Sequence, residues 1–256
     1  GSLLWEAGTE IYGYGAPAIA DMDGDGCAEV TFGREIFDCH GAQVATGAAG
    51  VGRYLSVAVD MDNDKDLELV AGNSVYEKDG SLLWQSTAPD GAPAIGDFDG
   101  DGLPDVVLVA SGTLSLVGND GVLRWQISIP SGTGGAPTVA DFDADGQPEI
   151  GVAGASEYCV YEGDGSIRWC NTVSDYSSNV TGSSVFDFEG DGAAEVVYAD
   201  EHTLWIYDGA SGAIEMQQDG HASGTLWEYP LIADVDNNGS TDIIVASNDY
   251  GIAGWH

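Results

Sequence analysis

One acidic nine-residue pattern recurs six times along this chain of 256 residues. Its first copy reads Asp-Met-Asp-Gly-Asp-Gly-Cys-Ala-Glu, with acids at positions 1, 3, 5 and 9 and Gly at position 6. The six copies, loops 1 to 6, occupy residues 21–29, 60–68, 97–105, 141–149, 187–195 and 234–242. Successive copies begin 37 to 47 residues apart, a period typical of folds built from one small unit per repeat.

The carboxylates of each loop predict a cation site. Carboxylates at positions 1, 3 and 5 of a tight turn repel one another unless a cation lies between them, and Ca²⁺ takes six to eight oxygen ligands at flexible angles. Gly at position 6 permits a positive φ, position 7 offers a backbone carbonyl, and position 9 closes the shell. An EF-hand starts similarly but carries its Glu at position 12, between helices. The remaining alternative is a solvated acidic turn without metal.

We therefore expect up to six Ca²⁺ ions, each with ligands at positions 1, 3, 5, 7 and 9 of its loop. In loops 1 to 3 these are Asp21, Asp23, Asp25, Cys27, Glu29, Asp60, Asp62, Asp64, Asp66, Glu68, Asp97, Asp99, Asp101, Leu103 and Asp105. In loops 4 to 6 they are Asp141, Asp143, Asp145, Gln147, Glu149, Asp187, Glu189, Asp191, Ala193, Glu195, Asp234, Asp236, Asn238, Ser240 and Asp242. Loop 2 is predicted to be the weakest site, because Lys65 replaces Gly at position 6.

The charge of the chain supports a structural role for these ions. There are 43 acidic residues against 6 basic ones, for a formal net charge of −37. Such a chain repels itself unless cations neutralise it, so calcium is expected to be part of the fold. The same charge argues against nucleic-acid binding, and no apolar run is long enough to predict a membrane span.

Short β-branched runs flank the loops and predict strands, for example at 18–20 and 30–32 around loop 1. Asp-Gly pairs at 79–80, 120–121 and 164–165 predict two-residue hairpin turns. Four short strands in about 43 residues correspond to one blade of a β-propeller. The fold class is therefore all-β, and we expect one domain, residues 1–256, with six four-stranded blades.

The N-terminal segment predicts how such a ring closes. Gly1 to Trp5 has the same sequence as Gly80 to Trp84, which is a predicted fourth strand, whereas the chain ends where a third strand is expected. We therefore expect the N-terminal strand to complete the last blade.

The four cysteines predict two local disulfides. Cys159 and Cys170 face each other across the predicted turn at 164–165, and Cys27 and Cys39 stand across another hairpin. Four cysteines permit three pairings, and free buried thiols are the alternative. Disulfides point to a location outside the cytoplasm.

Several residues resemble the FG-GAP (VCBS) repeats of integrin α-subunit propellers and their bacterial relatives. The Phe-Gly pair stands at 32–33, Gly-Ala-Pro occurs at 15–17, 91–93 and 135–137, and all six calcium loops match. The resemblance implies calcium between the first and second strands of each blade, and a role in binding proteins or glycans. Integrin propellers have seven blades, so a seven-bladed ring with one blade missing is the alternative.

Aromatic residues separate into two groups. Trp5, Trp84, Trp125 and Trp169 share one repeat position, which predicts packing between blades. Residues in the connections between blades, on the face opposite the calcium loops, form a candidate ligand face, with ordinary loop residues as the alternative. These residues are Trp227, Tyr229, Tyr176, Tyr54 and Arg53.

Enzymatic activity is not expected, because the four histidines are unaccompanied and neither H-E-x-x-H nor G-x-S-x-G occurs. We expect an extracellular recognition or adhesion module, a monomeric domain of a larger secreted or cell-surface protein. Its partner is expected to be an extracellular protein or glycan. The alternatives are a propeller domain of a polysaccharide-acting enzyme and a passive spacer.

Overall fold

The computed structural model describes residues 2–9, 15–52, 55–220, 228–247 and 251–255, and these form antiparallel sheets without any α-helix. The first three sheets consist of β1 (Ala18–Ala20), β2 (Glu29–Phe32), β3 (Glu35–Phe37), β4 (Gln43–Thr46); β5 (Val57–Val59), β6 (Glu68–Ala71), β7 (Ser74–Tyr76), β8 (Leu82–Gln85); and β9 (Ala92–Gly96), β10 (Asp105–Ala110), β11 (Thr113–Val117), β12 (Leu123–Ser128). The next three consist of β13 (Thr138–Ala140), β14 (Glu149–Ala153), β15 (Glu157–Tyr161), β16 (Ile167–Thr172); β17 (Ser183–Phe186), β18 (Glu195–Ala199), β19 (Thr203–Tyr207), β20 (Ile214–Asp219); and β21 (Leu231–Ala233), β22 (Asp242–Ser247), β23 (Gly251–Trp255).

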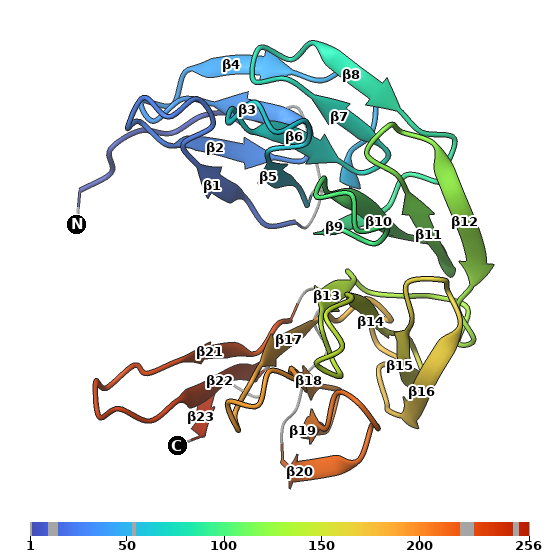
Figure 1. Cartoon of the computed structure of the whole chain (residues 1–256). Coiled ribbons are helices and arrows are strands. Elements are labelled where there is room, and N and C mark those ends of the chain that lie inside the picture. Colours follow the sequence, from blue (N-terminus) through green and yellow to red (C-terminus); the bar gives the residue numbers. More distant parts are fainter. Residues whose placement is uncertain (1, 10–14, 53–54, 221–227, 248–250, 256) are drawn as a thin grey trace. The chain divides into compact units, whose positions relative to one another are not determined.

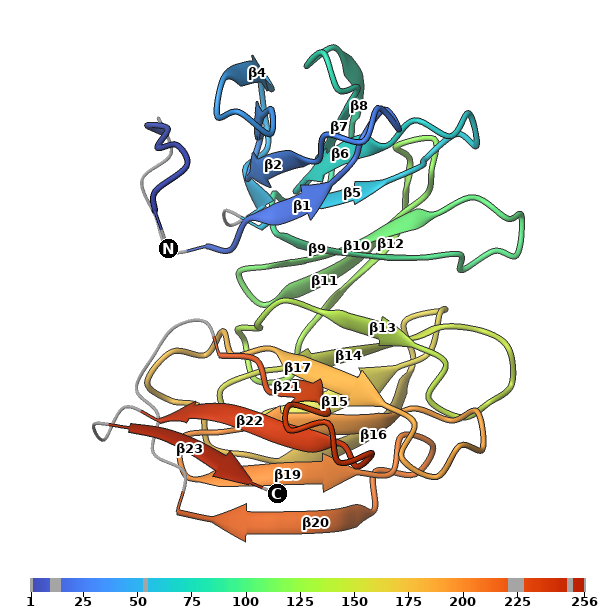
Figure 2. The same cartoon turned by 90° about the vertical axis from the view of Figure 1, so that its left-hand side faces the viewer.

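The chain forms two compact units, residues 1–127 and 128–256. In each sheet the strands lie side by side in chain order (Figures 1 and 2). Within the first unit the first strands of successive sheets touch, β1 with β5 and β5 with β9, and within the second unit β17 touches both β13 and β21. Each unit is therefore propeller-like, since its sheets follow one another through their first strands. The described part of the chain has no helix that could serve as a membrane span.

Each acidic loop joins the first two strands of its sheet, as the sequence predicts. The residue at position 9 begins the second strand in all six sheets. It pairs with the last residue of the first strand, as Ala20 does with Glu29 and Ala140 with Glu149. The loop is therefore held at both ends by the antiparallel ladder.

The hairpin turns between third and fourth strands differ from the prediction. In the turn at 162–166 the amide of Gly165 donates to the carbonyl of Glu162 (2.9 Å), and the amide of Glu162 donates to Ser166 (2.9 Å). Gly165 has φ of +83°. This is a three-residue loop with a glycine bulge rather than a two-residue turn, and the turns at Gly80 and Gly121 repeat it. The bulge shifts the register by one residue, which places Cys159 opposite Cys170.

Tryptophans on the outer strands pack against the turn of the following sheet, as predicted. A Cβ added to Gly121 would lie 2.9 Å from the ring of Trp84, and one added to Gly212 would lie 2.6 Å from the ring of Trp169. The indole of Trp169 also donates to the carbonyl of Gly209 (2.7 Å). Only glycine fits beneath each ring, so these contacts join neighbouring sheets closely.

The N-terminal segment differs from the expected strand. Residues 2–9 form no strand, because an extended segment becomes a strand only by pairing with a sheet edge. At the other end of the chain, β23 is the third strand of its sheet, as predicted, and that sheet has three strands among the described residues.

Candidate metal centres

All six loops share one hydrogen-bond pattern. In loop 3 the amide of Gly102, at position 6, donates to Asp97 (2.9 Å), and the amide of Leu103 donates to Asp101 (2.8 Å). The amide of Phe98, at position 2, donates to the position-9 carboxylate of Asp105 (3.0 Å). The same three bonds, from positions 6 to 1, 7 to 5 and 2 to 9, recur in the other five loops. The backbone therefore holds the acidic side chains in the same arrangement each time.

The backbone conformation explains the glycines. Position 6 has a φ between +85° and +95° in every loop. Five loops carry Gly there, whereas loop 2 carries Lys65 at +85°. A side chain is strained in this region, as predicted for Lys65. That loop 2 is the weakest calcium site remains a prediction.

The carboxylates at positions 1, 3 and 9 converge. In loop 1, one oxygen each from Asp21, Asp23 and Glu29 lie within 4.8 Å of one another, and loops 2 and 3 show the same grouping. Oδ1 of Asp21 is buried and accepts no hydrogen bond. Such an oxygen is costly unless it is paired, and three converging carboxylates with one unpaired oxygen fit Ca²⁺, which binds through oxygen.

Burial of the position-9 carboxyl groups also favours a bound cation. Glu68 and Glu149 are each only 1% exposed. Burial, reinforced by nearby carboxylates, raises the pKa of Glu68 and of Glu149 to about 7. Burial and the neighbouring Glu189 raise the pKa of Glu195 to about 7, and burial also raises the pKa of Asp105. A bound cation would hold these groups in their charged form at neutral pH.

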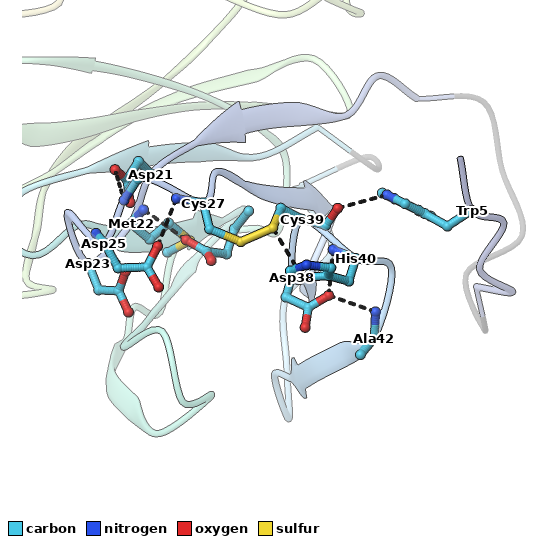
Figure 3. Close-up of a disulfide and its surroundings, with 12 residues drawn as sticks. Trp5, Asp21, Met22, Asp23, Asp25, Cys27, Asp38, Cys39, His40 and Ala42 are labelled. Carbon is cyan, nitrogen blue, oxygen red and sulfur yellow. Dashed lines mark hydrogen bonds between the residues drawn. A yellow bond between two sulfur atoms is a disulfide. The ribbon is translucent and has the colours of Figure 1, made fainter. Parts of the chain in front are cut away.

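A disulfide braces loop 1 (Figure 3). Cys27, at position 7 of the loop, is bonded to Cys39 in the turn between β3 and β4. The indole of Trp5 donates to the carbonyl of Cys39 (3.0 Å). The second predicted disulfide, Cys159–Cys170, is also present, so the four cysteines offer no thiolate to a metal. The ligand roles of positions 5 and 7 remain predictions.

The structure describes two of the five residues of the candidate ligand face. Tyr176 is 67% exposed, in the connection between β16 and β17. Tyr229 packs against Gly182, where an added Cβ would lie 1.9 Å from its ring. Tyr54, Arg53 and Trp227 lie outside the described residues.

The connection that carries Tyr176 is held by buried carboxylates. Asp200 accepts from the amide of Ser174 (3.1 Å), and Asp175 accepts from the amide of Thr181 (3.2 Å). Both carboxylates are buried. Sequence reasoning did not single them out. Asp175 bonds within its own connection, whereas Asp200 lies 26 residues from Ser174, in the turn between β18 and β19.

Sequence reasoning also missed two basic residues that contact the loops. Lys78 forms ion pairs with Asp23 and Glu29 of loop 1, and Arg168 pairs with Asp143 of loop 4. The available signal was the rarity of basic residues, which number 6 in the chain.

Comparison with known proteins gives a family match for two segments of the chain. The family model described as FG-GAP-like repeat matches residues 97–152 and 187–245. No curated protein sequence matches the chain.

Solved structures share the fold at low sequence identity. The biofilm matrix protein Bap1 of V. cholerae is similar with a TM-score of 0.79 and 18% identity, over 93% of this chain and 66% of that one. The rhamnogalacturonan lyase PL11 of Bacillus licheniformis has a TM-score of 0.57 and 18% identity, over 93% of this chain and 44% of that one. BamB from Moraxella catarrhalis has a TM-score of 0.56 and 13% identity, over 93% of this chain and 70% of that one.

The first two of these proteins are longer than this chain, which spans about two thirds of one and less than half of the other. At these identities the likeness concerns the fold. Together with the family match and the six loops of one geometry, it supports one assignment: residues 97–152 and 187–245 match FG-GAP-like repeats, within a propeller-like all-β fold.

Proposed function

We propose that the chain is an extracellular, calcium-stabilised β-propeller domain that recognises a protein or a glycan and has no catalytic activity of its own. The observation that carries the calcium proposal is the repetition of one carboxylate arrangement in all six loops, with buried position-9 acids and an unpaired buried oxygen in Asp21. Bound Ca²⁺ would supply positive charge and oxygen-binding capacity at each loop, and so would stabilise the fold.

The packing of Trp5 supports a closed ring of six blades. Trp5 lies on Gly41, where an added Cβ would be 2.6 Å from its ring, as Trp169 lies on Gly212. The indole of Trp5 donates to the carbonyl of Cys39, and that of Trp169 donates to the carbonyl of Gly209. The two acceptors hold the same place in their turns. The N-terminal segment therefore has the packing of an outer strand that precedes the first sheet. We propose that the three-stranded sheet β21–β23 supplies the edge with which it pairs.

The proposed location and role rest on other observations. Two disulfides favour an oxidising compartment, and a biofilm matrix protein shares the fold. A recognition role is supported by the exposed Tyr176 on a connection held by buried carboxylates, because an aromatic side chain on a rigid loop can stack on a sugar or anchor a protein.

The first test is the number of bound calcium ions per chain, measured by elemental analysis together with thermal melts before and after addition of a chelator. We expect five or six ions, because loop 2 is predicted to be the weakest of the six sites. Each site contributes about 2.7 kcal/mol at a hundredfold excess of calcium over its Kd, so chelation should lower the melting temperature strongly. Zero or one ion with an unchanged melt would contradict the calcium proposal.

The second test addresses recognition. The domain is applied to arrays of glycans and extracellular proteins with and without calcium, beside a Tyr176→Ala variant. Binding that depends on calcium and on Tyr176 would support the ligand face. Absence of binding to every array would favour a passive spacer. Cleavage of a polysaccharide by the purified chain would instead favour the polysaccharide-acting enzyme, the class to which the similar rhamnogalacturonan lyase belongs.

A further inference from the structure

Arg168 is built into loop 4 by three contacts. Its Nε donates to the carbonyl of Ala210 (2.8 Å), in the turn of the next sheet. One terminal nitrogen pairs with Glu162 (2.8 Å), and the other pairs with Asp143 (2.6 Å), at position 3 of loop 4. The side chain is 23% exposed. Two anchors outside the loop therefore hold the guanidinium against a predicted calcium ligand.

Lys78 has a corresponding place at loop 1. It lies in the turn between β7 and β8 and reaches across to the loop of the preceding sheet. Its ammonium group contacts Asp23, at position 3, and Glu29, at position 9 (3.2 Å). Two of the six basic residues of the chain thus contact predicted ligands of loops 1 and 4.

Arg124 shows that this contact is not an automatic result of the repeat. Arg124 and Arg168 occupy the same position, one residue before the tryptophan of the outer strand. Yet Arg124 pairs with Asp120 in its own turn (3.1 Å), and among the described residues it has no ion pair with loop 3. It therefore provides a matched control.

We propose that Arg168 and Lys78 are tethered counter-cations that weaken calcium binding at loops 4 and 1 while supporting these loops when calcium is scarce. The inference rests on the proposed calcium function. A unit positive charge held beside one ligand carboxylate repels a divalent ion, and at a dielectric close to that of water this amounts to about tenfold in affinity. The same charge reduces the repulsion among the loop carboxylates when no ion is bound. Loops 1 and 4 then bind calcium only at higher calcium concentrations than they would without these side chains. The six loops are therefore occupied over a range of calcium concentrations.

The glycine at position 6 allows each loop to be followed separately. The amide of Gly146 donates to Asp141 of loop 4, that of Gly102 to Asp97 of loop 3 and that of Gly26 to Asp21 of loop 1, each at 2.9 Å. The NMR resonances of these amides, in the chain labelled with ¹⁵N-glycine, therefore report binding loop by loop. The experiment is a calcium titration in chelator buffers of the whole chain, its Arg168→Gln, Lys78→Gln and Arg168→Lys variants, and the Arg124→Gln control.

We expect Arg168→Gln to lower the calcium midpoint of Gly146 about tenfold and to leave that of Gly102 unchanged. Lys78→Gln should do the same at Gly26. Arg168→Lys keeps the charge and should keep the midpoint of the unaltered chain. Arg124→Gln should leave the Gly146 midpoint in place and should lower the Gly102 midpoint less than Arg168→Gln lowers that of Gly146, because Arg124 acts on Asp105 of loop 3 without forming an ion pair with it. In chelator, Arg168→Gln should melt about 2–4 °C lower, as expected for loss of a half-buried ion pair.

The two proposals fail in different ways. If the glycine amides of the unaltered chain respond to calcium but Arg168→Gln leaves the Gly146 midpoint in place, the counter-cation inference is wrong and the calcium function stands. A higher midpoint in Arg168→Gln also overturns the inference, because it means that Arg168 positions Asp143 for the ion. If no glycine amide of the unaltered chain responds, both proposals are wrong.

Discussion

Replacing Lys65 by glycine tests whether loop 2 is strained by its own sequence. Lys65 has φ of +85°, and its amide donates to Asp60 (3.0 Å), as the glycine amides do in the other loops. The side chain is exposed, so the substitution removes little packing. The change therefore acts mainly on backbone strain and on one positive charge in an acidic loop.

The size of the effect follows from two opposing quantities. A residue other than glycine in the left-handed region costs about 1–2 kcal/mol. Glycine in the unfolded chain has more conformational freedom, which costs about 0.5–1 kcal/mol on folding. Lys65→Gly should therefore stabilise the chain by roughly 0.5–1 kcal/mol, or about 1–4 °C in melting temperature for a chain of this size.

The matched control is Lys65→Gln, which removes the charge but keeps the strained backbone. Thermal melts of both variants are compared with the unaltered chain in saturating calcium and in chelator. In chelator both variants lose the positive charge that offsets the loop carboxylates, so Lys65→Gly should be more stable than Lys65→Gln by the strain that only glycine relieves. In calcium both should gain from the lost charge, and Lys65→Gly should gain more. Equal melting temperatures for the two variants under both conditions would refute the strain argument.

Two further predictions concern pH and packing. Because the folded state raises the pKa of Glu68 and Glu149 from 4.5 to about 7, it binds more protons than the unfolded chain between these values. The calcium-free chain should then lose stability as the pH rises from 4.5 to 7, each carboxyl group contributing a loss of about 1.4 kcal/mol for every pH unit. Saturating calcium should abolish this loss of stability. Thermal melts at pH 5 and pH 8, with and without calcium, test the prediction. A calcium-free chain that is equally stable at the two pH values would contradict it. Gly212→Ala should destabilise the chain by more than about 2 kcal/mol, because its Cβ would meet the ring of Trp169 at 2.6 Å. The control is Gly132→Ala, because Gly132 has a similar φ of +77° and an added Cβ would meet no neighbour within 4 Å. Urea denaturation of both variants separates the backbone strain from the contact with Trp169. Equal losses of stability in the two variants would show that the Trp169 contact is unimportant.

Local sequence determined the parts of this protein that depend on neighbouring residues. The loop at 97–105 is recognisable because its ligands and the amides that orient them lie within nine residues. The pairing of Cys159 with Cys170 was also predictable, since both belong to one hairpin. The bulge at Gly165 was not predicted, because an Asp-Gly pair suits both a two-residue turn and a three-residue loop.

Contacts between sheets needed the tertiary structure. Lys78 is 55 residues from Asp23 in the chain, and Arg168 is 42 residues from Ala210, so no local pattern connects them. Arg124 and Arg168 hold the same place in the repeat and yet pair differently. The sequence by itself therefore determined the six loops and their strands, through short-range hydrogen bonds and side-chain alternation. Only the packing of one sheet against the next decided which carboxylates have a basic partner, because that depends on where a neighbouring turn places its side chains.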